Sequence, residues 1–266
     1  MGGFIKLLGQ LTLGFFRWLG QLTDLVIEMG TAIVRGRPRF NLTGHQIVSV
    51  GFGSQLVVIV TGAFTGAVFA AQSYFKFSDL GLASGVGPVV SIALCRELGP
   101  VLTGLMVSGR VGAAMAAEIG TMKVTEQVDA LRSMGVHPVD YLVIPRAIGL
   151  MFSMPLLVAE AIGFGLLASH VLIVWHFNVP STWYDYHVVA NTALEDIAIG
   201  MIKGFVFGAL IVVISCHQGL KATNGAVGVG RGTTAAVVQS SLAILITNMF
   251  LSFLLNYFFP LGSGNY

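Results

Sequence analysis

Charged residues are scarce in this chain. Only 10% of the 266 residues are Asp, Glu, Lys or Arg, whereas 55% are hydrophobic, and the mean hydropathy is +0.84. One soluble core of this size cannot bury so much apolar surface. The formal net charge of +2 is too small to indicate a nucleic-acid partner. The composition therefore predicts an integral membrane protein.

Cysteine is almost absent, and so are the motifs of catalysis. Cys95 and Cys216 both lie in apolar runs, where we expect them to be small buried hydrophobic residues. The chain has no CxxC or HExxH metal pattern, no GxSxG elbow and no GxxxxGK[ST] phosphate loop. We therefore expect no metal, no cofactor and no catalytic residue. If the protein performs work with ATP, another chain must hydrolyse it.

Apolar runs of about 20 residues recur along the chain without the alternation of a membrane barrel, which predicts helical spans. We expect five, at about residues 47–70, 88–118, 144–175, 197–216 and 235–259. The 34 glycines favour helices that pack closely in lipid, and Gly62 and Gly66 form a GxxxG pair in the first span. Gly99 and Pro100 predict a kink in the second span. The glycine-rich run GVGRGTT is expected in the loop before the fifth span.

Residues 1–40 predict an N-terminal amphipathic helix followed by a basic boundary, and residues 41–266 the five-span domain. Polar residues recur at intervals of three or four and form one stripe on this helix. They are Lys6, Gln10, Arg17, Gln21, Asp24 and Glu28. The helix is therefore expected to lie in the membrane interface. An amphipathic helix that faces a partner protein is the alternative.

The distribution of basic residues predicts the orientation. Arg35, Arg37 and Arg39 mark a cytoplasmic boundary, and eleven of the 14 basic residues fall on or near the same side if the N-terminus is cytoplasmic. The connections at about residues 72–87 and 176–196, together with the C-terminus, then lie on the far side of the membrane.

A short polar segment follows Met122 and predicts a cytoplasmic helix at about residues 124–135, between the second and third spans. Thr125 can act as its N-cap, and Gly135 can end it before Pro138. Its apolar face is expected to carry Val124, Val128, Leu131 and Met134.

Four ionisable residues lie inside or at the start of apolar spans, where a charge is costly unless it is paired. Arg96 and Glu97 are adjacent and point about 100° apart, so they need partners from another helix. Lys203 and Asp196 lie at a similar depth in the fourth span, and we expect the four to form one network. The network could be a structural brace, the polar rim of a substrate cavity, or both.

Arg110 lies thirteen residues beyond Glu97, roughly 20 Å along the helix, and therefore belongs to the cytoplasmic half. Snorkelling, or pairing with Glu118 or Glu160, is favoured over contact with a transported substrate.

Three runs resemble the MlaE (YrbE) family, the permease subunits of MCE-type phospholipid ABC transporters. They are RELGPVLTGLMVSGRVGAAMAAEIGTMKVTEQVDALRSMGVHPVDYLVIPR, IKGFVFG and GVGRGTTAAVVQSS. The resemblance extends from about residue 40 to the C-terminus. It implies a subunit of the bacterial inner membrane that helps to move phospholipid between inner and outer membranes and to maintain outer-membrane lipid asymmetry. It also implies that the C-terminus is periplasmic.

The resemblance also implies partners and site residues. The partners are a second copy in a homodimer, a cytoplasmic ATPase of the MlaF type, a periplasmic MCE hexamer of the MlaD type, and a STAS-domain subunit of the MlaB type that binds the ATPase. Lipid would be bound by Arg96, Glu97, Leu98 and Lys203, with Asp196 as a looser match. The short cytoplasmic helix would couple to the ATPase through Thr125, Glu126, Gln127, Asp129, Ala130, Leu131 and Arg132.

An ion-coupled secondary transporter or channel is the competing hypothesis, with the intramembrane charges as a relay. Five spans show no evident inverted repeat, which argues against it. A third possibility is a structural anchor for other subunits.

Overall fold

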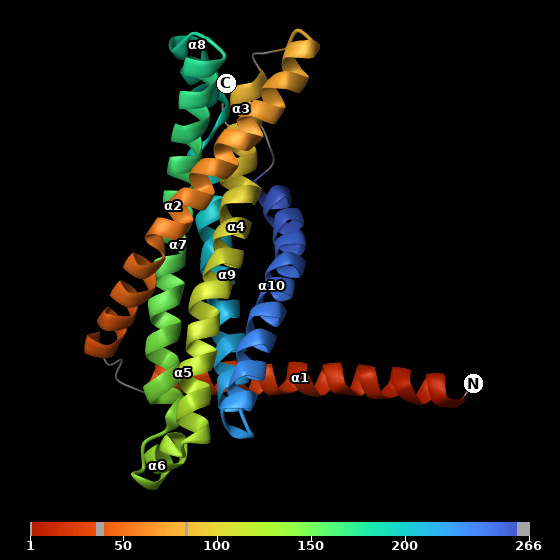
Figure 1. The fold of residues 1–266 in the computed structure, drawn as a ribbon, viewed down its shortest axis with the longest axis vertical. Helices are drawn as coiled ribbons and strands as arrows, with labels where there is room; N and C mark the ends of the chain where they lie inside the picture. Colours follow the sequence, from red (N-terminus) through yellow and green to blue (C-terminus); the bar gives the residue numbers. More distant parts are fainter. Residues whose placement is uncertain (1, 36–39, 83–84, 260–266) are drawn as a thin grey trace.

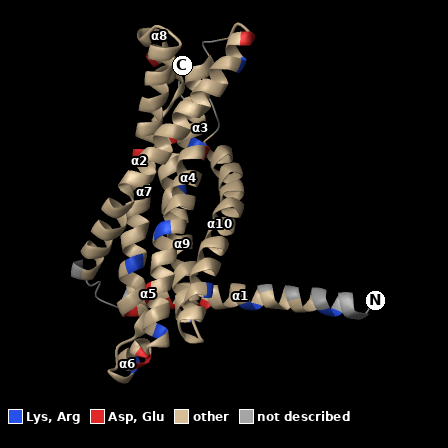
Figure 2. Cartoon of the chain, viewed as in Figure 1, with Lys and Arg blue, Asp and Glu red and all other residues tan. Residues whose placement is uncertain are grey.

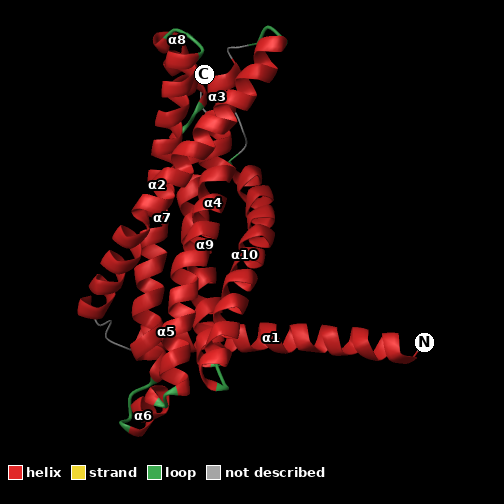
Figure 3. Ribbon diagram, viewed as in Figure 1, coloured by secondary structure: helices red, strands yellow, loops and turns green. Residues whose placement is uncertain are grey.

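The computed structural model describes residues 2–35, 40–82 and 85–259. These residues form helices joined by short loops, and no strand occurs among them (Figure 3). Five helical segments are long and apolar enough to cross a membrane. They are Leu42–Asp79, Val86–Val124, Val139–His176, Leu194–Leu220 and Gly225–Phe258. The predicted all-helical fold with five spans is therefore confirmed.

The first helix, α1 (Gly2–Arg35), lies across one end of the bundle and projects beyond it (Figure 1). Leu25 and Met29 are buried in the main hydrophobic core and anchor the helix there. Lys221 Nζ also donates a hydrogen bond to Gln21 Oε1 at 2.6 Å. Arg37 and Arg39 of the predicted basic boundary lie outside the described residues, as does the side chain of Arg35.

The first span belongs to α2 (Phe40–Asp79), which packs against α7 (Ile144–Val171) through glycines. A Cβ atom on Gly62 would collide with the backbone of Ala161, and one on Gly66 with the backbone of Gly165. Only glycine permits this approach, because backbone atoms cannot move aside as a flexible side chain can. The close packing predicted for the GxxxG pair is confirmed.

The second span is a series of helices in one line, α3 (Val86–Ala93), α4 (Gly99–Val107) and α5 (Ala113–Val124). Two π-helical segments join them, η2 (Leu94–Leu98) and η3 (Ser108–Gly112). The break predicted at Gly99 and Pro100 takes this form, with η2 ending directly before Gly99. Proline has no N–H, so the carbonyl of Arg96, four residues earlier, has no α-helical donor.

The third span combines the π-helical segments η4 (Val139–Val143) and η5 (Leu172–His176) with α7 between them. It is preceded by the short helix α6 (Gln127–Ser133) and followed by α8 (Ser181–Asn191). The fourth and fifth spans are α9 (Leu194–Leu220) and α10 (Gly225–Phe258). Figure 1 shows α6 and α8 at opposite ends of the bundle, which we call the α6 end and the α8 end.

Three boundaries differ from the sequence prediction. Helix α2 continues to Asp79, well into the segment predicted as a turn, and α8 is a helix where only a connection was expected. Helix α10 begins at Gly225, so the run predicted as a loop is helical. In lipid every backbone group needs an internal partner, and a helix supplies one even where glycine lowers the helical propensity.

Charged residues are concentrated toward the ends of the bundle, with few along its middle (Figure 2). Helix α10 stands at the edge of the bundle beside α4 and α5 (Figure 1). Only 11% of the apolar stretch of this span is buried, compared with 50% for the span in α9. One face of α10 therefore packs on the bundle while the rest of its apolar surface is available to lipid or to another protein.

Candidate functional site

The four charges predicted to form a network lie together in the half of the bundle nearer the α8 end. Arg96 is buried in η2, and its Nε donates a hydrogen bond to Asp196 Oδ1 in the first turn of α9. The other oxygen of Asp196 accepts a bond of 2.8 Å from the backbone N–H of Ala193, so one carboxylate caps α9 and neutralises Arg96.

Lys203 is the second cation of the network, and its side chain is only 1% exposed. Its Nζ donates to the carbonyl of Arg96 at 2.6 Å, to Glu97 Oε1 at 2.9 Å and to Ser252 Oγ at 2.8 Å. The first of these bonds uses the carbonyl that Pro100 leaves without an α-helical donor. All three N–H bonds of the ammonium are therefore used.

Helix α10 closes the network with three uncharged polar residues that the sequence analysis missed. Asn248 Nδ2 and Ser252 Oγ donate to Glu97, and Arg96 Nη1 donates to Asn256 Oδ1 at 2.7 Å. Positions 248, 252 and 256 are four residues apart, which places them on one face of a helix. That regular spacing within an apolar run could have identified them.

The network has equal numbers of positive and negative groups, and only one of the four reaches the surface to any extent. The side chain of Glu97 is 41% exposed, whereas those of Arg96, Asp196 and Lys203 are at most 7% exposed. In this conformation the network is a closed, neutral brace between η2, α9 and α10. A ligand that needed either cation would have to displace partners that α10 now supplies.

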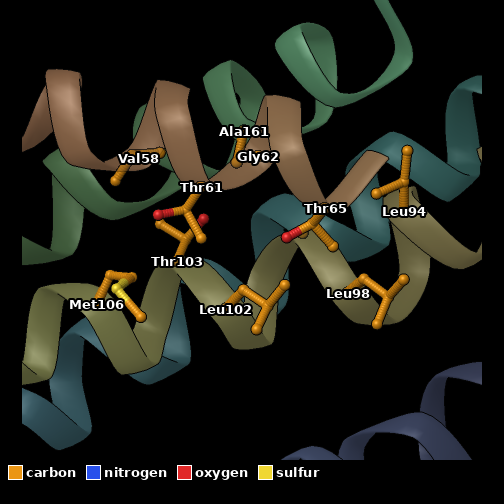
Figure 4. A pocket seen from close by; sticks show the side chains of 11 residues that line it. Val58, Thr61, Gly62, Thr65, Leu94, Leu98, Leu102, Thr103, Met106 and Ala161 are labelled. Carbon is orange, nitrogen blue, oxygen red and sulfur yellow. The ribbon is translucent and has the colours of Figure 1, made fainter. Parts of the chain in front are cut away.

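Leu98 lies outside this network. It lines an apolar groove between α2 and α4, where Thr61, Thr65 and Thr103 are the polar lining residues (Figure 4). The hydroxyl of Thr103 is buried and has no hydrogen-bond partner among the described residues. The structure thus brings together four of the five residues predicted to bind lipid and separates the fifth from them.

Of the two roles predicted for Arg110, snorkelling or pairing with Glu118 or Glu160, the pairing is wrong. Arg110 Nη1 donates to Ser54 Oγ of α2 at 2.7 Å, whereas Glu118 pairs with Arg146 at 3.0 Å and Glu160 accepts from Gln55 Nε2 at 2.8 Å. Ser54 and Gln55 carry no charge, so the sequence does not mark them as partners of Arg110 and Glu160.

The segment predicted to couple to an ATPase contains α6, but its N-terminus differs from the prediction. Thr125 ends α5, and its Oγ1 donates to the carbonyl of Thr121 at 2.8 Å instead of capping α6. Glu126 precedes α6 with a positive φ of 61° and makes no side-chain cap. The chain turns sharply between α5 and α6, and Glu126 in the left-handed backbone conformation makes this turn in place of a threonine N-cap.

The surface of α6 is mixed. Val128 is fully buried beneath the helix, Leu131 is half-buried, and Met134 is 69% exposed, so the predicted apolar face is only partly covered. Asp129 pairs with Lys123 Nζ at 2.9 Å and with Arg132 at 3.5 Å, which ties α6 to the end of α5. Gln127, Ala130 and Arg132 are exposed.

Metal-binding clusters do not occur in the part of the chain that the structure describes, since it contains no group of three or more His, Cys, Asp or Glu suitable for an ion. Both cysteines are free and buried, in agreement with their assignment as hydrophobic core residues.

Comparison with known proteins identifies a family and several relatives. A family described as Permease MlaE matches residues 43–254. A probable ABC transporter permease protein of Rickettsia typhi is 42% identical over 250 residues, which cover 94% of this chain and 96% of that protein. A similarly named protein of Synechocystis is 42% identical over 223 residues, 84% of this chain and 85% of its own length.

A plant protein is also similar. The chloroplastic protein trigalactosyldiacylglycerol 1 of Arabidopsis thaliana is 38% identical over 254 residues, which cover 93% of this chain and 70% of that protein. The match of the family across all five spans, together with relatives of this identity over most of the chain, leads to one conclusion: the chain is a multi-pass membrane permease of the MlaE family.

Proposed function

We propose that this permease carries phospholipid, as the membrane subunit of an ATP-driven transporter that moves lipid between the inner and outer membranes of a bacterium and maintains outer-membrane lipid asymmetry. The observation that carries the proposal is the network of Arg96, Glu97, Asp196 and Lys203, which holds two cations at membrane depth beside an exposed apolar helix. A cation at that depth suits a lipid phosphate, and the apolar face of α10 suits acyl chains. The Arabidopsis relative is named after a glycerolipid, trigalactosyldiacylglycerol, and this name supports a lipid as the transported substrate.

The geometry suggests how one site could be both a brace and a cavity rim. Asn248, Ser252 and Asn256 all belong to α10, the least buried of the spans. If α10 moves away from α4, Lys203 loses Ser252 and Arg96 loses Asn256, so each cation regains a free N–H. Lipid phosphate would then replace the lost acceptors, and return of α10 would expel it.

The partners in this proposal are a second copy of the chain, a cytoplasmic ATPase of the MlaF type that docks on α6, a periplasmic MCE hexamer of the MlaD type, and an MlaB-type STAS subunit on the ATPase. In this arrangement the α6 end is cytoplasmic, and α1 lies in the membrane interface. The partly covered apolar surface of α6, with Met134 69% exposed, supports a docking role.

The test is purification of the chain together with the proteins and lipids that remain bound to it. We expect phospholipid close to one molecule per dimer, an associated ATPase, and loss of the lipid in Lys203→Met. The control is Lys76→Met, which removes an exposed lysine near the end of α2. Leu131→Asp should leave the lipid bound but release the ATPase.

The alternative, an ion-coupled transporter, predicts different results in the same experiments. If no ATPase associates, no lipid is retained, and Glu97→Gln abolishes a proton- or sodium-dependent flux in proteoliposomes, the network is a relay and the lipid proposal fails.

A further inference from the structure

Arg110 is a cation inside a membrane span without an acidic partner. It lies in η3, fourteen residues before the end of α5, or about 21 Å along the helix. None of the ion pairs within 4.0 Å among the described residues includes it. Arg96, Lys203 and Arg146 each pair with a carboxylate. A single serine hydroxyl is a weak substitute for such a partner.

The guanidinium of Arg110 is held in a defined position. While Nη1 bonds to Ser54, the group lies against the bare backbone of Gly53, where a Cβ would be only 2.6 Å from Nη2. Two neighbouring residues of α2 thus position the cation. Arg110 is exposed, but this hydrogen bond and the close approach to Gly53 orient its guanidinium.

Arg110 lines a pocket of about 150 Å³ between α2 and the segment formed by η3 and α5. Gln46 and Ser49 line it from α2 and can both donate hydrogen bonds, as can Arg110. Glu118 also lines it, but its carboxylate is already paired with Arg146 at 3.0 Å. A water molecule occupies about 30 Å³ in the liquid, so the pocket has room for a tetrahedral anion.

The depth of Arg110 indicates the source of that anion. If the span Val86–Val124 is centred on the bilayer, Arg110 lies about 7 Å from the midplane toward the α6 end. The hydrocarbon half-thickness is about 15 Å, and arginine extends its head group toward the nearer interface. A lipid of the leaflet at the α6 end could bring its phosphate to this level by entering sideways between the two helices.

We propose that this pocket binds the phosphate group of a membrane phospholipid from the leaflet at the α6 end, with Arg110 as the principal ligand and Gln46 and Ser49 as supporting donors. The choice of ligand rests on the proposed function. The site itself is separate from the network at Arg96 and Lys203 and belongs to the other half of the same span.

Photo-crosslinking tests the site directly. Benzoylphenylalanine replaces Ala114, an exposed residue that lines the pocket, and the purified protein is placed in nanodiscs with radiolabelled phosphatidylglycerol. We expect a labelled product whose yield falls about tenfold in Arg110→Gln, because a charge-assisted hydrogen bond to phosphate is lost, and only partly in Arg110→Lys. Gly53→Ala should also lower the yield, since its Cβ displaces the guanidinium without removing it.

Two controls make the result specific. Benzoylphenylalanine at Phe64, which is 69% exposed on α2, reports bulk lipid and proper insertion, and its yield should not change in Arg110→Gln. Lys203→Met should abolish the co-purified lipid of the proposed function yet leave the crosslink at position 114 intact. An unchanged crosslink at position 114 in Arg110→Gln would overturn the inference without affecting the proposed function. Complete competition by an excess of inorganic phosphate would show a free-anion site and would equally overturn the lipid assignment.

Discussion

At the scale of single residues, the arrangement around Lys203 shows how a buried charge is tolerated in a span. Its three donors reach a backbone carbonyl, a carboxylate and a hydroxyl from η2 and α10. Pro100 contributes indirectly, since its missing N–H leaves the carbonyl of Arg96 for the ammonium. The lysine therefore substitutes for a backbone donor as well as forming an ion pair.

Lys203→Met should destabilise the protein by about 3 kcal/mol. This is the lower end of the range for breaking a buried pair, because Glu97 is 41% exposed and can be partly hydrated. Unfolding in an SDS titration measures the change. The double variant Glu97→Gln with Lys203→Met removes the unpaired charge and should recover part of the loss. Equal stability of the single and double variants would show that the ion pair is not the cause.

At the scale of elements, the contact between α2 and α7 depends on the absence of side chains. Gly62 and Gly66 bring α2 against the backbone of Ala161 and Gly165, so that two long helices touch directly. In lipid, where apolar burial between helices gains little, such close contact supplies much of the packing energy.

Gly66→Ala should lower the free energy of unfolding by about 2 to 3 kcal/mol, because the added Cβ can be accommodated only by separating two backbones. Gly44→Ala in the same helix is the matched control. A Cβ there meets nothing within 4 Å, so the change should be neutral or stabilise by up to about 1 kcal/mol. SDS unfolding compares the two, and similar effects would contradict the packing argument.

The attachment of α6 to α5 should depend on pH. The hydrogen bond that Lys123 donates to Asp129 holds the pKa of this carboxyl below its usual value of 3.8. A carboxyl with a lowered pKa stabilises the folded state fully above its unfolded pKa, and this contribution is lost as the pH falls through the folded pKa. Hydrogen exchange of the α6 amides, corrected for intrinsic rates, should therefore accelerate in acid.

Asp129→Asn tests the cause of that acceleration. The variant should show the faster exchange already at neutral pH and should match the wild type below the lowered pKa. If the wild type and the variant exchange alike at neutral pH, the pair with Lys123 does not fix α6.

At the scale of the whole molecule, the orientation in the membrane remains a prediction from charge, with the α6 end cytoplasmic. Cysteine labelling can test it, because the two native cysteines are buried and should give little background. Ser133 and Thr182 are exposed at the α6 end and the α8 end, respectively. In cells with a permeabilised outer membrane, a membrane-impermeant maleimide should label Thr182→Cys at once and Ser133→Cys only after lysis. The reverse pattern would invert the topology and exclude an ATPase at α6.

The spans and the four-charge network could be predicted because each rests on a large energy, the transfer of apolar runs to lipid and the cost of an unpaired charge. The start of α10 could not be predicted, because a glycine-rich run usually indicates a loop in a soluble protein. In lipid the same run forms a helix, since its backbone groups need internal hydrogen-bond partners. The partner of Arg110 was also missed, because a serine on a distant helix has no charge to mark it. Leu98 was predicted to bind lipid together with Arg96 and Glu97, but it lines the groove between α2 and α4 instead.

The two π-helical segments of the second span have a consequence for direction. On an uninterrupted α-helix, Arg96 and Arg110 would face within about 40° of each other, since they are fourteen residues apart. Each π turn adds about one residue, and both arginines lie inside such a turn, so about one extra residue in total falls between them and changes that angle to about 140°. Arg96 accordingly meets α9 and α10, whereas Arg110 meets α2 on the other side of α4 (Figure 1). The π-helical turns thus determine which neighbouring helices the two arginines face. Deletion of one residue from η2 would turn Arg96 and Arg110 toward the same side of the span.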